Sequence, residues 1–352
     1  MAKPLLLQNP NMLRFWLGQT GAFMAYNMLV VAVGWQVYDL TSSAMSLGLV
    51  GLIQFLPQLL LTLIVGHVAD RYDRRKISLA CQWAKMAMAA VLGIGSLTHT
   101  ISVEMIFVCA AGIGAARAFE MPAMQAMLPT LLAPDQLPRA VAAAAGGREL
   151  AVILGPALGG FIYVFGADKV YLLGTAIFFL AGIAIIGIRL AKATPPAVGP
   201  GKLATLLGGI QYIKARPVIL GAISLDLFSV LLGGATALLP IYARDILVTG
   251  PWGLGLLRAA PALGAISMSL YLARHPLQRR VGKIMMTAVA GFGLATIVFG
   301  ISRWFPLSMA ALVVLGATDM ISVVTRQSLV QLETPDEMRG RVSSGEIGRA
   351  HV

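Results

Sequence analysis

The chain has 352 residues, of which 58% are hydrophobic and 12% are charged, and its formal net charge is +12. A soluble domain carries about 25% charged residues, so this composition argues against a soluble protein and for an all-α membrane protein. The positive charge does not indicate a nucleic-acid partner, because the basic residues gather in short loops between apolar runs and form no continuous basic helix. We therefore expect the lipid bilayer to be a partner of the chain and nucleic acid not to be one.

Ten apolar runs are long enough to cross a membrane, since a helix of about 20 apolar residues spans the hydrocarbon core. In chain order they lie at about 13–38, 46–69, 77–98, 101–123, 140–164, 170–190, 217–242, 252–273, 283–302 and 306–330. Cys81 and Cys109 both fall inside such runs, and the four histidines show no zinc-binding spacing. We therefore expect neither a disulfide framework nor a metal site, and no cofactor.

The loop 66–76, between the second and third runs, is the densest charge cluster of the sequence. A short loop this rich in Arg and Lys stays on the cytoplasmic side of a membrane. That assignment places the N-terminus in the cytoplasm. The outer loops then hold only Lys169, Arg244 and Arg303 as basic residues, while the inner loops hold many more. The charge distribution therefore supports this orientation.

A linker containing Pro195 and Pro196 divides the chain into two halves that resemble each other weakly. The sequence 134–141 is similar to 335–342. Transporters are often built from such repeats. We therefore predict four parts: an N-terminal six-helix bundle (1–190), a cytoplasmic linker with an amphipathic stretch (191–216), a partial C-terminal bundle of four helices (217–344) and a non-native tail (345–352).

The last seven residues, 346–352, are a literal translation of GAGATCGGAAGAGCACACGTC. All but the first base of that string is a common sequencing-adapter sequence. We therefore expect the natural chain to continue after about Ser344. A genomic stop codon directly after Val352 would contradict this expectation.

Several predicted spans contain ionisable side chains, which cost roughly 2.5–3.5 kcal/mol each to insert and therefore suggest function. These candidates for substrate contact and proton uptake are Arg117, Glu120, Arg148, Glu149, Asp226, Arg258, Asp319 and Arg326. A carboxylate in a partly dry cavity can load and release a proton near neutral pH. The alternative is a static ion pair between helices, and this remains open for Arg117 and Glu120, whose spacing puts them on one helix face.

Asp226 has no nearby opposite charge in its own predicted helix, which favours a functional role. Lys85 is expected to lie close enough to a helix end for its ammonium to snorkel to the membrane surface. We therefore do not count Lys85 among the candidates.

The loop after the second span has Gly66, Asp70, Arg71, Arg74 and Arg75 at characteristic spacings. This pattern resembles the loop motif of the major facilitator superfamily, in which such a loop is thought to latch the cytoplasmic ends shut. The usual Gly before the paired Arg residues is replaced here by Asp73, which can cap the third helix instead. The alternative is that the loop is only a topological anchor, and the helix that would complete the latch belongs to the missing part of the chain.

The fifth span carries Gly155, Pro156, Gly159 and Gly160. Gly155 and Gly159 form a small face that allows close helix contact, and Pro156 favours a bend. The stretch resembles the Gly-Pro-x-x-Gly-Gly motif of proton-coupled exporters in the superfamily, although plain helix packing is an alternative. One feature departs from drug exporters: no Arg precedes the Gly-x-Gly of the fourth span, and Arg117 follows it instead.

The phrase 115–123 is similar to the enterobactin-exporter-like branch of the superfamily. The resemblance implies two pseudo-symmetric six-helix bundles, of which about ten helices are present, that rock about a central cavity in the bacterial inner membrane. It also implies a monomer that exports a siderophore or drug in exchange for protons. Asp226, Glu120 or Glu149 would take the proton, and Arg117 or Arg148 would respond.

Three alternatives remain open: an uptake permease of the same fold, a non-transporting scaffold, and an inert fragment. We do not expect an enzyme, because no loop outside the membrane is long enough to hold a catalytic site.

Overall fold

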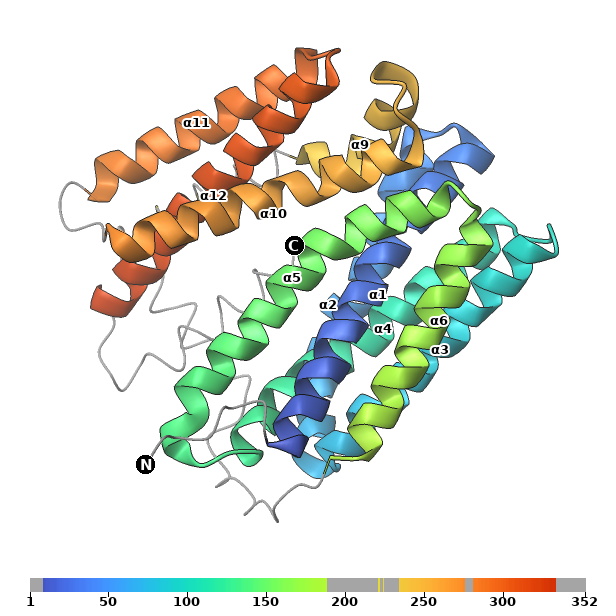
Figure 1. Cartoon of the computed structure of the whole chain (residues 1–352), viewed down its shortest axis with the longest axis vertical. Coiled ribbons are helices and arrows are strands. Elements are labelled where there is room, and N and C mark those ends of the chain that lie inside the picture. Colours follow the sequence, from blue (N-terminus) through green and yellow to red (C-terminus); the bar gives the residue numbers. More distant parts are fainter. Residues whose placement is uncertain (1–8, 189–220, 222–223, 225–233, 276–280, 334–352) are drawn as a thin grey trace. The chain divides into compact units, whose positions relative to one another are not determined.

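A computed structural model describes residues 9–188, 221, 224, 234–275 and 281–333 of the chain (Figure 1). These residues are mostly helical. The long helices are α1 (Pro10–Thr41), α2 (Ala44–Arg71), α3 (Arg74–Leu97), α4 (Val103–Met127), α5 (Leu137–Tyr163), α6 (Ala167–Ile186), α10 (Gly250–Arg274), α11 (Val281–Ile301) and α12 (Phe305–Glu333). Nine of the ten predicted spans are thus confirmed as helices, and most of the seventh lies outside the described residues.

Short helical turns complete the described segments. They are η2 (Leu128–Thr130), η3 (Pro134–Gln136), η4 (Gly234–Leu238), α9 (Leu239–Ile241) and the π-helical turn η5 (Tyr242–Ile246). Of the helices within the described ranges, eight are long and apolar enough to cross a membrane. The exception among the nine long helices is α4, which carries Glu104, Arg117 and Glu120.

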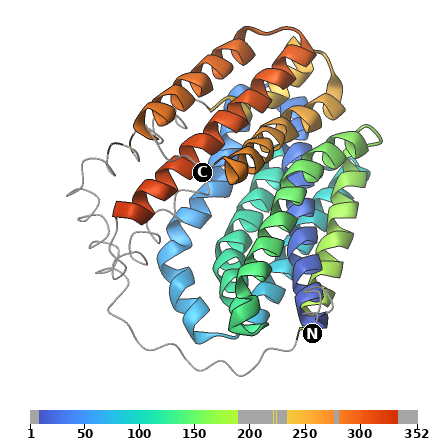
Figure 2. The ribbon, with the colours of Figure 1, turned by 60° about the vertical axis from the view of Figure 1, so that its left-hand side comes forward.

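The chain divides into two compact units. The first contains α1 to α6 together with Thr236–Ala259, and the second contains the rest of α10 with α11 and α12. Within the first unit α1 packs against α5 and α6, α3 packs against α4 and α6, and α2 packs against α4 (Figure 2). Within the second unit α11 packs against α12.

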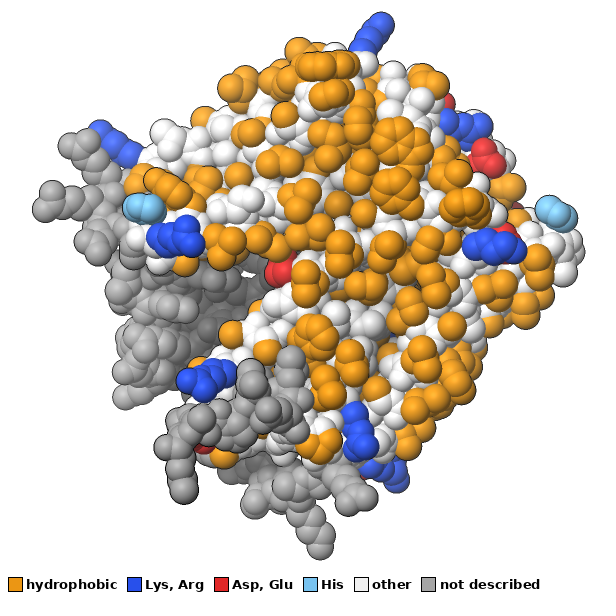
Figure 3. Space-filling model, in the orientation of Figure 1, with side chains coloured by type: hydrophobic (Ala, Val, Ile, Leu, Met, Phe, Trp, Pro, Cys, Tyr) orange, Lys and Arg blue, Asp and Glu red, His pale blue; other side chains and the backbone are white. Residues whose placement is uncertain are grey.

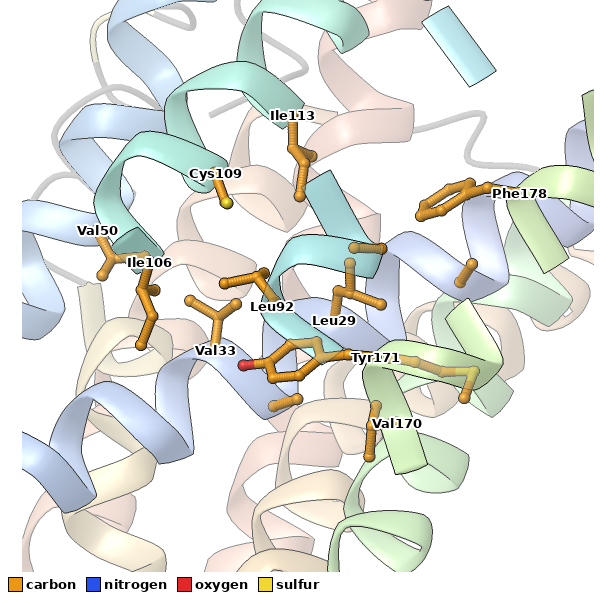
Figure 4. Packing of buried hydrophobic residues seen from close by; sticks show 14 of the residues in the cluster. Leu29, Val33, Val50, Leu92, Ile106, Cys109, Ile113, Val170, Tyr171 and Phe178 are labelled. Carbon is orange, nitrogen blue, oxygen red and sulfur yellow. The ribbon is translucent and has the colours of Figure 1, made fainter. Parts of the chain in front are cut away.

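The core of the first unit is a cluster of apolar side chains from α1, α3, α4 and α6 (Figure 4). Leu29, Leu92 and Phe178 meet there with Tyr171, whose hydroxyl donates a 2.8 Å hydrogen bond to Gln36. The buried phenol is thereby satisfied, as a polar group in an apolar core must be.

The outer surface is also apolar. Figure 3 shows one face on which hydrophobic side chains predominate and charged side chains are sparse. Large side chains such as Leu60, Leu180 and Leu294 are more than half exposed. Such extensive exposed apolar surface suits contact with lipid rather than water.

Candidate functional site

A buried ion pair joins two helices in the interior of the first unit. The Lys85 ammonium on α3 lies 2.8 and 2.7 Å from the two carboxylate oxygens of Glu120 on α4. Gln82, one helical turn before Lys85, donates a 2.5 Å hydrogen bond to the same carboxylate. The Lys85 side chain also lies 4.8 Å from the centre of the Phe178 ring on α6. Glu120 is therefore held by two side chains of α3, and one of them, Lys85, also lies over an aromatic ring of α6.

This arrangement contradicts the expectation for Lys85, and it shows for Glu120 the static ion pair between helices that the sequence left open. Lys85 does not snorkel: α3 extends from Arg74 to Leu97, so Lys85 lies midway along it and is 1% exposed. Glu120 pairs with Lys85 and not with Arg117, although Arg117 is three residues away on the same helix. Spacing within one helix reveals neighbours on that helix but cannot show a partner on the next one.

Arg117 instead belongs to a cluster of basic and aromatic side chains contributed by α1, α4 and α5. Its guanidinium carbon lies 3.7 Å from the centre of the Tyr26 ring and 5.9 Å from that of Phe23. The guanidinium carbon of Arg148 lies 5.3 Å from the Phe23 ring centre. These distances are those of cation–π contacts. Arg117, Arg148 and the two rings are all partly exposed.

Two further charged residues adjoin this cluster. Arg258, in the part of α10 that belongs to the first unit, interacts electrostatically with Tyr26. Glu149 is exposed and interacts with Arg148, but among the described residues no ion pair joins the two side chains. The structure thus brings Arg117 and Arg148 together around two rings of α1, while Glu149 and Arg258 interact electrostatically with Arg148 and Tyr26.

The glycines of α5 bring α1 close to this cluster. A Cβ atom at Gly155 would lie 2.6 Å from the Cβ of Asn27, and one at Gly159 would lie 2.8 Å from the Cα of Met28. Both distances are shorter than real Cβ contacts, so the two helices can approach this closely only because these positions are glycine. The prediction of a small face on this helix is confirmed.

The third glycine of this motif faces a different helix. A Cβ at Gly160 would lie 2.9 Å from the Cα of Gly255 on α10, and a Cβ at Gly255 would lie 2.5 Å from the Pro156 carbonyl oxygen. Pro156 lies inside α5, which continues through it. The predicted helix-5 motif therefore packs against two helices within the first unit.

Two arginines of the basic segment 66–76, at the start of α3, bind the C-terminal ends of other helices. Arg74 donates a 2.8 Å hydrogen bond to the Ala126 carbonyl in the last turn of α4, and Arg75 donates one of 2.9 Å to the Ile188 carbonyl, just after α6. Cations are favourable at helix C-termini, where carbonyls lack partners. Asp73 caps α3 by accepting from the Arg75 backbone N–H at 2.9 Å, as predicted. The side chains of Asp70 and Arg71 and the surroundings of Gly66 lie outside the described residues, and the gating role of the loop stays a prediction.

The remaining predicted residues lie elsewhere. Asp319 is on α12 in the second unit and is partly buried. The side chain of Arg326 and the whole of Asp226 lie outside the described residues. In the segments that the structure describes, no group of three or more His, Cys, Asp or Glu side chains could hold a metal ion.

A polar cluster at the other end of α1 was not predicted. The Tyr38 hydroxyl donates a hydrogen bond to Asp245, and Arg244 lies 3.1 Å from an Asp39 carboxylate oxygen. Arg244 also donates a 3.2 Å hydrogen bond to the Tyr38 carbonyl. The cluster ties the end of α1 to η5. The sequence offered only a weak signal for it, an acidic residue at the end of one span and an Arg–Asp pair at the end of another.

Sequence comparisons identify relatives along nearly the whole chain. Residues 7–344 match the family described as transmembrane secretion effector. The chain is 24% identical over 340 residues to the enterobactin exporter EntS of Escherichia coli O1:K1 / APEC, covering 96% of this chain and 81% of that protein. The EntS of Shigella boydii serotype 18 matches to the same extent.

Solved structures of transporters share the fold. A bacterial homologue of the human lysosomal transporter Spinster, inward-facing and unoccupied, matches with a TM-score of 0.77 at 13% identity, covering 99% of this chain and 80% of that one. A bacterial homologue of the iron transporter ferroportin, inward-facing, matches with a TM-score of 0.69 at 16% identity, covering 98% and 89%. The chain is a multi-pass membrane transporter, and it belongs to the transmembrane secretion effector family of the major facilitator superfamily.

Proposed function

We propose that the chain exports a small amphiphilic molecule, a siderophore or a drug, in exchange for protons. It would do so as a monomer in the bacterial inner membrane, with its N-terminus in the cytoplasm and its two bundles rocking to expose the site to each side in turn. The similarity to an enterobactin exporter supports the export direction.

The observation that carries the proposal is the group of charges around Phe23 and Tyr26. Arg117, Arg148 and Glu149 are partly or fully exposed although they lie midway along α4 and α5, in a unit whose other long helices are long and apolar enough to cross a membrane. Charged groups at such depth face a water-filled path rather than lipid, because exposure to hydrocarbon is costly. A polar path through the bundle is what a transporter of water-soluble or amphiphilic molecules requires.

The contacts of Glu120 and Glu149 also distinguish these two candidate proton acceptors. Glu120 is 8% exposed and bound by Lys85 and Gln82, so its charge is already compensated. Glu149 is exposed and has no such partner in the described part of the chain. We therefore favour Glu149 over Glu120 as the proton acceptor, with Asp226 as the further candidate.

Efflux measurements in intact cells test this proposal. The protein is expressed in a host that lacks its own exporters, and efflux of a fluorescent drug and of a catecholate siderophore is followed with and without a protonophore. We expect efflux of at least one of them, and we expect the protonophore to abolish it. Efflux that persists in the protonophore, or net accumulation driven by the protein, would reject proton-coupled export, and accumulation would favour an uptake permease.

A further inference from the structure

The arginines around Phe23 and Tyr26 form no ion pair with any carboxylate of the described residues. Among the described residues Arg117 makes no ion pair, and its contacts are the two aromatic rings of α1. The same holds for Arg148, which lies over Phe23 and forms no ion pair with the adjacent Glu149. The one other nearby carboxylate, Glu120, is matched by Lys85.

Within the described part of the chain, positive charge therefore accumulates at this place without a matching number of carboxylates. Arg117 and Arg148 interact electrostatically with each other as like charges, and Arg258 interacts electrostatically with Tyr26. Among the described residues, Glu149 supplies the opposing charge and acts on Arg148 from the neighbouring position. An uncompensated pair of guanidinium groups within a membrane protein is unfavourable until an anion binds.

The two aromatic rings indicate what a bound molecule would carry besides its negative charge. Phe23 and Tyr26 are one helical turn apart on α1, and each ring has a guanidinium over it. An aromatic face beside a planar guanidinium accommodates a flat, apolar group, while the guanidinium fork binds carboxylate, sulfonate or phenolate oxygens. Partial exposure of all four side chains leaves their surfaces accessible to such a molecule.

We infer that Arg117 and Arg148, together with Phe23 and Tyr26, form a binding site selective for aromatic anions. The site would reject the lipophilic cations that a negatively charged pocket accepts, since like charges in a low-dielectric site repel strongly. This inference rests on the proposed function, because it names the substrate class of the same site.

Equilibrium binding to purified protein tests the inference without requiring transport. The full chain is reconstituted into nanodiscs of neutral phosphatidylcholine, and fluorescence anisotropy follows two dyes that share the xanthene ring system: anionic fluorescein and cationic rhodamine 123. We expect fluorescein to bind at least about tenfold more tightly than rhodamine 123. Arg117→Gln and Arg148→Gln should each weaken fluorescein binding by about tenfold or more, because each removes a charge-assisted hydrogen bond.

Two variants control the measurement. Arg139→Gln removes the same charge from the exposed start of α5 and should leave fluorescein affinity within about twofold. Arg117→Lys keeps the charge but loses the planar stacking on Tyr26, so its affinity should lie between those of the native protein and Arg117→Gln. Each variant is compared only if it elutes as a monodisperse species with an unchanged melting temperature.

The possible outcomes separate the inference from the proposed function. Tighter binding of rhodamine 123, binding of neither dye, or fluorescein affinity that is indifferent to both Arg→Gln changes would overturn the anion site. Proteoliposomes report the function separately: if fluorescein binds as expected but a proton gradient does not move it, proton-coupled export fails and the anion site stands. If a proton gradient moves rhodamine 123 and not fluorescein, export stands and the anion site fails.

Discussion

Lys85 and Glu120 show how a pair of charges can lie inside an apolar bundle. Each is taken out of water, and each is compensated only by the other and by Gln82. Such a pair adds little net stability over well-packed apolar residues, but loss of one partner leaves an uncompensated buried charge. The pair is therefore best tested by removing its members singly and together.

We expect Lys85→Met to destabilise the purified protein by about 3–5 kcal/mol, because Glu120 would remain buried without its cation. Thermal unfolding followed by fluorescence-detected size-exclusion chromatography measures the effect. The double variant Lys85→Met/Glu120→Leu should recover most of the loss.

The exposed pair Lys169–Asp168 provides the control for this prediction. Its ammonium and carboxylate oxygen are also 2.7 Å apart, but the Lys169 side chain is 55% exposed. Lys169→Met should therefore change stability by less than about 1 kcal/mol. Equal effects of Lys85→Met and Lys169→Met would contradict the importance of burial.

The two glutamates should differ in function. We expect Glu149→Gln to abolish the dependence of efflux on the proton gradient while leaving the amount of folded protein unchanged, because Glu149 is exposed. Glu120→Gln should instead lower the amount of folded protein, because it leaves the Lys85 charge buried without a counter-charge. Efflux by Glu149→Gln that still collapses with a protonophore would shift the proton-accepting role to another carboxylate.

The sequence predicted part of this site. Arg117, Arg148, Glu149 and Arg258 were identified because a charge within an apolar run is conspicuous. The structure places Arg117 and Arg148 over two rings of α1, and Glu149 and Arg258 interact electrostatically with Arg148 and Tyr26. Lys85 is equally conspicuous, but it lies well inside both the predicted span 77–98 and α3, so the expectation that it reaches the membrane surface was wrong for a reason other than the helix ends: its partner Glu120 is on the next helix. Phe23 and Tyr26 could not be distinguished, since aromatic residues in a membrane helix are ordinary.

At the scale of elements, α5 is positioned by its glycines. The prediction of its small face needed only the spacing of Gly155 and Gly159, because residues four apart lie on one side of a helix. The partner helix could not be predicted, since the choice between α1 and any other helix depends on tertiary packing. In the structure Gly155 and Gly159 of α5 pack against α1, and Gly160 packs against α10.

We expect Gly159→Ala to destabilise the protein by about 1–3 kcal/mol, because the added methyl group would press on the backbone of Met28 and force the helices apart. Gly146→Ala on the same helix is the matched control, since nothing lies within 4 Å of its added Cβ. That change should be neutral or slightly stabilising. Thermal unfolding of the two variants side by side distinguishes them, and similar losses for both would contradict close packing at Gly159.

At the scale of the whole molecule, the orientation in the membrane remains a prediction from loop charge. The chain suits a labelling test, because its two cysteines, Cys81 and Cys109, are both buried. We expect an impermeant maleimide to label Thr100→Cys from outside intact cells and Asp135→Cys only after permeabilisation, since both positions are exposed at opposite helix ends. The reverse pattern would place the N-terminus outside, and labelling of the unmodified chain would show that a native cysteine is accessible.

The length of apolar runs was enough to predict nine long helices, because a membrane leaves few other ways to satisfy backbone hydrogen bonds. The way the helices pack together was not predictable in the same manner. It depends on contacts such as those between Tyr38 and Asp245, whose residues are more than two hundred positions apart. The family resemblance supplied the overall fold, and it did so through a few motifs rather than through helix lengths.

The buried pair also constrains how the chain enters the membrane during synthesis. Lys85 emerges at the middle of α3, before its counter-ion exists, and a lone Lys at that depth costs about 2.5–3.5 kcal/mol on insertion. Glu120 follows on the very next helix, so α3 and α4 can leave the translocon together as a neutralised hairpin. A nascent chain that ends after α3 should therefore integrate less efficiently than one that ends after α4. Glycosylation mapping in microsomes can measure this, and Lys85→Leu should remove the difference.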